Sequence, residues 1–188
     1  MSGTTPIAMS WMLDASTFIN AVVVDRVMLM ALLRSPLFFP EFVFRFELGI
    51  NAREATRAAA AHAVDRKQIG VQQLTLADLD RLSQLAAPRK IGLGELACAI
   101  IAERTSGGVL CDDWRAKAWI EQHVAAACWD SIEGVLLQAA ASGHVGELDL
   151  VDLQKTLETN RYHCRCDLRM EYLQRLILGA RSTNRNIL

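Results

Sequence analysis

The sequence has no surplus of positive charge. Its 188 residues include 20 lysines and arginines and 21 aspartates and glutamates, which gives a formal net charge of −1 at pH 7. This balance excludes the class of protein whose whole surface binds nucleic acid by neutralising phosphate groups. Any contact with nucleic acid must therefore come from a local patch of basic side chains.

Long apolar runs are also absent, since none reaches the roughly 18 residues that a membrane-spanning helix needs. The first ten residues, MSGTTPIAMS, lack the basic start and the apolar core of a signal peptide. The five cysteines are an odd number scattered through apolar segments, which is typical of reduced thiols and not of a disulfide framework. These absences predict a cytoplasmic protein that does not enter a membrane, with a flexible N-terminus over residues 1–8.

Proline is scarce, with four residues, and 52% of the chain is hydrophobic, which excludes an intrinsically disordered protein. A chain of this length fits one domain and buries about two thirds of the surface of its unfolded state. We therefore expect it to fold without a disulfide or a structural metal.

Short apolar segments alternate with longer helical patterns along the chain. Strands are predicted at residues 8–13, 69–76, 109–111 and 124–129. Helices are predicted at residues 17–34, 40–67 with a bend at Gly49, 76–86, 92–108, 114–122, 130–143, 147–160 and 167–180. This alternation is typical of an α/β fold with a central parallel sheet that helices cover on both faces.

Acidic residues follow two of the predicted strands. Asp14 comes directly after the first strand, and the pair Asp112 and Asp113 comes directly after the strand at 109–111. In open parallel sheets the ligand crevice lies outside the carboxyl ends of the strands, so these acids are expected at one edge. Two structural interpretations stay open: Asp14 can cap the following helix, and an aspartate pair often forms a solvated turn.

Two further acids stand in helical patterns. Glu47 lies in the apolar stretch FVFRFEL, where a lone acid is costly unless it is paired, for example with Arg45 or Arg53. Glu95 lies in the first turn of the helix at 92–108, where it can also complement the helix dipole. Convergence of these acids with those at the strand ends predicts an oxygen-only site of the kind that Mg²⁺ or Mn²⁺ occupies.

Four segments resemble, in order and at compatible spacing, the acidic motifs of the PIN-domain ribonuclease family: LDASTFIN, FPEFVFRFEL, GLGELACAIIAE and VLCDDWRAK. The resemblance covers roughly residues 9–140 and is strongest to a PIN-like branch with a GxGE helix start and a DD strand end. It implies a PIN-like three-layer α/β/α nuclease domain over residues 9–142, a C-terminal helical extension of that domain over 143–180 and a tail over 181–188.

The resemblance also implies an activity and its residues. The family consists of Mg²⁺- or Mn²⁺-dependent endoribonucleases that hydrolyse single-stranded RNA, often as homodimers and as the toxins of toxin–antitoxin pairs. By position, the expected catalytic residues are Asp14, Glu47, Glu95, Asp113 and the neighbouring Asp112. The expected metal ligands are Asp14, Glu95, Asp112 and Asp113, and Ser16 and Asn20, which match the family's small polar positions, are expected contacts to RNA phosphates. Arg115 and Lys117, which lie beside the acids in the sequence, are further candidates for phosphate contacts, with an extended patch at Arg53, Arg57, Arg66 and Lys67. The alternative stays open that these basic residues form ordinary solvated helix faces.

This sequence departs from the family at two positions: Cys111 stands where many relatives have threonine or serine, and Glu95 where many have aspartate. The main alternative function is a catalytically silent PIN-fold module that binds RNA or a protein. A phosphatase of the type that requires a D-x-D motif after the first strand is disfavoured, because DAS stands there.

The segment HCRC at residues 163–166 does not predict a zinc site, even with His144 as a further ligand. Adjacent His163 and Cys164 cannot easily face one ion, and the chain has no CxxC partner.

Overall fold

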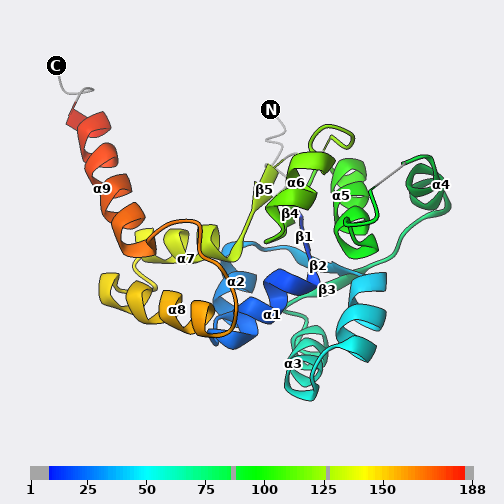
Figure 1. Ribbon diagram of the computed structural model, residues 1–188, viewed down its shortest axis with the longest axis horizontal. Helices are drawn as coiled ribbons and strands as arrows, with labels where there is room; N and C mark the ends of the chain where they lie inside the picture. The colour runs from blue at the N-terminus through cyan, green and yellow to red at the C-terminus, as the bar shows by residue number, and fades with distance from the viewer. Residues whose placement is uncertain (1–8, 86–87, 126–127, 185–188) are drawn as a thin grey trace, which may run out of the picture.

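The computed structural model describes residues 9–85, 88–125 and 128–184. Within these residues, five parallel strands form one sheet in the order β3-β2-β1-β4-β5, with helices on both faces (Figure 1). The predicted three-layer α/β/α architecture is thus confirmed. The strands are β1 Trp11–Leu13, β2 Leu37–Pro40, β3 Gly70–Gln72, β4 Gly108–Leu110 and β5 Cys128–Asp130.

Helices fill most of the remaining chain. They are α1 Ala15–Val23, α2 Val27–Leu33, the π-helix η1 Val43–Asn51, α3 Glu54–Asp65, α4 Leu76–Gln84, α5 Leu93–Thr105, α6 Trp114–Ile120, α7 Ile132–Ala141, α8 Glu147–Thr159 and α9 Leu168–Asn184. In the described part of the chain, none of them is long and apolar enough to span a membrane. The proposed flexible segment at residues 1–8 lies outside the described residues, as does the end of the proposed tail after residue 184.

The order of the strands creates a switch point beside β1. From β1 the chain runs outward to β2 and β3, and then returns to place β4 on the other side of β1. Leu13 pairs with Leu110 in register, so the carboxyl ends of β1 and β4 lie level. In open α/β sheets a ligand crevice forms at such a point, because the connecting segments diverge to opposite sides.

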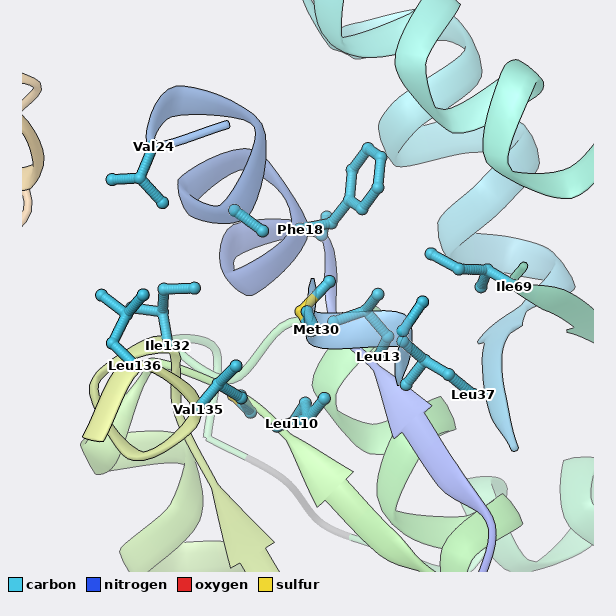
Figure 2. Close-up of a cluster of buried hydrophobic side chains, with 14 of the residues drawn as sticks. Leu13, Phe18, Val24, Met30, Leu37, Ile69, Leu110, Ile132, Val135 and Leu136 are labelled. Carbon is cyan, nitrogen blue, oxygen red and sulfur yellow. The ribbon is translucent and has the colours of Figure 1, made fainter. Parts of the chain in front are cut away.

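The larger core lies between the sheet and the helices α1, α2 and α7. Leu13 and Leu110 of the central strands face Phe18, Met30 and Ile132, all with zero exposure (Figure 2). Leu150, Leu157 and Leu168 belong to the same buried cluster, so α8 and the start of α9 pack on this core. The opposite face has a smaller core between α5 and α6 that includes Leu96, Ala99, Ala116 and Ile120.

Two predicted helices are wrong in extent. The helix predicted at 17–34 divides into α1 and α2, because Asp25 has a φ of 53° in the left-handed region and ends the first helix. The helix predicted from about residue 40 does begin there, at residue 41, but residues 37–40 before it form strand β2, which was not predicted. Gly49 does not divide that helix; the extended residues Ala52 and Arg53 separate η1 from α3 instead.

Candidate active site

Asp14 lies at the switch point and is almost completely buried, with 3% exposure. Its backbone N–H donates to the Leu110 carbonyl (3.0 Å), and its Oδ2 accepts hydrogen bonds from the Ser16 N–H (3.0 Å) and hydroxyl. It therefore caps α1, as the structural interpretation expected. Burial raises the pKa of Asp14, and the hydrogen bonds from Ser16 oppose that effect.

Glu47 comes to the same site from the π-helix η1, a type of helix that is often found at functional positions. Its carboxylate lies against the backbone of Gly94 in the first turn of α5, so close that a Cβ there would be 2.6 and 2.7 Å from its two oxygens. Burial raises the pKa of Glu47 from 4.5 to about 7, with further increases from the charges of Asp14 and Glu95. The alternative pairing with Arg45 does not occur, because Arg45 pairs with Glu41.

Glu95 lies in the first turn of α5, where its carboxylate turns back to the Gly92 backbone. Burial raises its pKa, and the charges of Asp14 and Asp113 raise it further. Asp14, Glu47 and Glu95 thus act on one another electrostatically although they come from three separate segments, and their convergence on one metal ion stays a prediction.

The two neighbouring aspartates have different surroundings. Asp112 is partly buried between α1 and α7, where one oxygen accepts from Asn20 Nδ2 (2.7 Å) and the other from the Ile132 N–H (2.8 Å). Burial raises the pKa of Asp112 to about 6. Asp113 caps α6, with Oδ1 accepting from the backbone N–H groups of Arg115 (2.8 Å) and Ala116 (3.1 Å).

The five acids of the site are not paired with basic side chains in the described part of the chain. Among the described residues, no ion pair involves any of the five acids. Buried carboxylates that raise one another's pKa favour either a proton or a divalent cation, and an all-oxygen donor set suits Mg²⁺ or Mn²⁺. In residues 9–85, 88–125 and 128–184, no group of three or more His, Cys, Asp or Glu side chains is arranged to hold a metal ion, and Asp14 and Asp113 both serve as helix caps.

The predicted RNA contacts have local partners. Ser16 and Asn20 bond to Asp14 and Asp112, respectively, and so hold those carboxylates in place. The Arg115 guanidinium lies 5.9 Å from the centre of the Trp114 ring, and Lys117 lies 3.7 Å from Glu121 one turn along α6.

Sequence reasoning missed a buried carboxylate beside Asp112. Glu133, 6% exposed, accepts hydrogen bonds from the Tyr162 hydroxyl (2.8 Å), the Arg165 N–H (3.1 Å) and the Cys166 thiol (3.5 Å). Arg165 also donates to the Asp112 carbonyl (3.1 Å). Through these hydrogen bonds, the HCRC segment connects the chain after α8 to the residues around Asp112. A signal existed in the sequence, since Glu133 interrupts an otherwise apolar helix.

Comparison of the chain with models of protein families, with curated proteins and with solved structures finds no match.

Proposed function

We propose that this chain is a PIN-like, metal-dependent endoribonuclease that hydrolyses phosphodiester bonds of single-stranded RNA. One observation carries the proposal: Asp14, Glu47 and Glu95 gather at the switch point of the sheet with no basic partner among the described residues. Such an arrangement opposes folding unless a cation offsets it. The same edge of the sheet is where α/β proteins bind substrates.

In this proposal Asp14, Glu47, Glu95 and Asp113 hold Mg²⁺ or Mn²⁺. When bound, the ion supplies an activated water and offsets charge on the scissile phosphate. Asp112 belongs to the support of the site, because Asn20 and the Ile132 N–H already use both of its oxygens. Ser16 orients Asp14 through two hydrogen bonds to the same carboxylate oxygen.

RNA, an antitoxin protein and a second copy of the chain are the proposed partners. The protein partners need an apolar surface, and α2 offers one because Met28 and Leu32 are 60% and 64% exposed.

The second candidate is a silent PIN-fold module that binds RNA or protein. The observation in its favour is that Asp14 and Asp113 both serve as helix caps. Titration with Mn²⁺ discriminates between the two, because a silent module does not gain thermal stability from the ion whereas a metal-binding site does.

The decisive experiment is cleavage of an end-labelled, mixed-sequence single-stranded RNA with Mn²⁺, with Mg²⁺ and with a chelator. We expect metal-dependent cutting by the wild type and its loss in Asp14→Asn and Asp113→Asn, since asparagine keeps the helix cap but removes the charge. Asp152→Asn, on the exposed face of α8, is the matched control. Equal cutting by all variants, or no cutting by folded wild type, would sink the nuclease proposal.

A further inference from the structure

One cavity of the structure is lined in part by Asn20, whose side chain also donates to Asp112. It has a volume of about 420 Å³ and is enclosed by α1, the junction of η1 and α3, and the end of α8. Its polar lining consists mainly of Asn20, Asn51, Arg53, Thr159, Asn160 and Arg161. No aspartate or glutamate is among the described residues that line it, in contrast to the cavity that includes Glu133.

The two arginines of this cavity have no protein partner. Within the described chain, neither the Arg53 nor the Arg161 side chain makes a hydrogen bond or an ion pair, whereas Arg34 and Arg104 are paired with aspartates. They reach the cavity from segments more than one hundred positions apart in the sequence. Polar side chains beside them already donate elsewhere in the protein, Thr159 to the Lys155 carbonyl and Asn160 to the Thr156 carbonyl. The two unpaired guanidinium groups are therefore what gives the pocket a chemistry that fits a phosphate group.

Asn20 connects this cavity to the acids. Its side chain lines the cavity, and its Nδ2 donates to Asp112. Asn20 also lies six positions after Asp14, which is about 9 Å along a helix at 1.5 Å per residue. The cavity and the acids are therefore near enough for one nucleic-acid strand to contact both.

We propose that this cavity, which we call the Arg53–Arg161 pocket, binds a backbone phosphate of the RNA substrate away from the bond that is cleaved. This inference rests on the proposed function. It adds a surface of the protein that holds the RNA substrate next to the acidic site. The pocket also provides the local basic patch that a chain with a net charge of −1 needs in order to bind nucleic acid, because its two arginines supply positive charge.

Arg161 permits a clean test. Its φ of 69° lies in the left-handed region, where glycine is favoured over residues with a side chain. Arg161→Gly therefore removes the guanidinium group and relieves the backbone at the same position. We expect an unchanged or higher melting temperature together with weaker RNA binding, a combination that a misfolded variant does not produce.

The experiment measures binding of a fluorescent, mixed-sequence single-stranded RNA in the presence of a chelator, so that binding is separated from cleavage. Arg53→Gln and Arg161→Gly should each weaken binding about tenfold, and each should reduce the slope of log affinity against log salt by about 0.7. Arg169→Gln, at the start of α9, where the arginine pairs with Glu147 on the surface, is the matched control and should bind as wild type. Unchanged affinity and slope in both pocket variants would overturn the inference.

The outcomes separate this inference from the proposed function. If wild type cleaves RNA and the pocket variants bind normally, the inference fails and the nuclease stands. If wild type binds without cleaving and the variants lose binding, the pocket stands and the nuclease fails. Inorganic phosphate alone, at constant ionic strength, should leave the melting temperature unchanged; a clear increase would indicate a site for free phosphate and contradict the assignment to RNA.

Discussion

Gly94 shapes the acidic site through the absence of its side chain. The Glu47 carboxylate occupies the space that a Cβ of residue 94 would fill. Because this carboxylate is the end of a flexible side chain, it can move when that space is taken. The smallest possible side chain at residue 94 is therefore enough to displace one of the proposed metal ligands without disturbing the core.

Gly94→Ala should reduce metal-dependent RNA cleavage by about 100-fold, since displacement of a reacting group by about 1 Å has effects of that size. Stability should stay level or rise by up to about 1 kcal/mol, because alanine favours a helix more than glycine does. Cleavage rates test the expected loss of activity, and urea unfolding of the same preparations tests the expected stability. The control is Leu93→Ala in the same turn, 58% exposed, and full activity in Gly94→Ala would contradict the argument.

Among the helices and strands, Arg34 connects three elements. It follows α2, donates from Nε to Asp130 of β5 (3.0 Å) and from Nη1 to Gln138 of α7, and its guanidinium lies 5.0 Å from the centre of the Trp11 ring. The side chains of Arg34 and Asp130 are only 8% and 19% exposed. The pair therefore fixes the edge of the sheet to the helices that cover it.

Arg34→Met should lower the free energy of unfolding by about 3 kcal/mol or more, because it leaves the Asp130 carboxylate largely buried without its cation. The double variant Arg34→Met, Asp130→Asn should recover part of this loss. Urea denaturation measures both. Arg45→Met is the control, since Arg45 is 67% exposed and such surface pairs contribute under about 1 kcal/mol. A loss of similar size in Arg34→Met and Arg45→Met would exclude a special role for Arg34.

Most helices and strands were predictable from the sequence. The points at which one element ends and the next begins were not. The helix that begins at Leu76 and the helix with Glu95 are found as expected, because each depends on nearby residues, such as the capping box of Thr75 and Asp78. Strand β2 was missed because an apolar run of four residues fits a strand or a buried helix equally well before its neighbours are known. The break between α1 and α2 depends on the positive φ of Asp25, which aspartate tolerates but which an aspartate in the sequence does not predict.

The candidate site was predictable in part for the same reason. Asp14 and Asp113 come after strands that were predicted to be parallel. Their position at the same edge of the sheet, outside the carboxyl ends of the strands, therefore follows from the predicted fold. The tie between Asn20 and Asp112 and the meeting of Arg53 with Arg161 depend on packing between distant segments. No local pattern contains that information.

In the molecule as a whole, the acidic site makes stability depend on pH. The pKa of Glu47 is raised to about 7 in the folded protein, and the pKa of Asp112 to about 6. Between pH 4.5 and 7 the folded state therefore binds more protons than the unfolded state at these positions. By linkage, the free energy of unfolding contributed by these groups decreases as the pH rises through this range.

Metal-free protein should accordingly melt at lower temperature at pH 8 than at pH 5, and Mg²⁺ or Mn²⁺ should restore part of the difference at pH 8. Glu47→Gln should reduce both the pH dependence and the response to the ion, because the neutral amide neither binds the proton nor gains from the charge. Differential scanning fluorimetry across this range checks the prediction, with Glu54→Gln on the exposed side of α3 as the control. A melting temperature that rises steadily from pH 5 to 8 without metal would contradict it.

The pairing of β1 with β4 also bears on the protein's synthesis. Asn20 and Asp112, which meet beside the site, are 92 positions apart in the chain. While the ribosome is still making the first half, β1 has only β2 beside it, and of the five acids only Asp14 and Glu47 have been made. If domains form as they emerge, Asp112 and Asp113 join Asp14 only after β4 has left the exit tunnel. We therefore expect a nascent fragment to lack the complete acidic site, so that the proposed activity begins only after this later part of the chain has emerged.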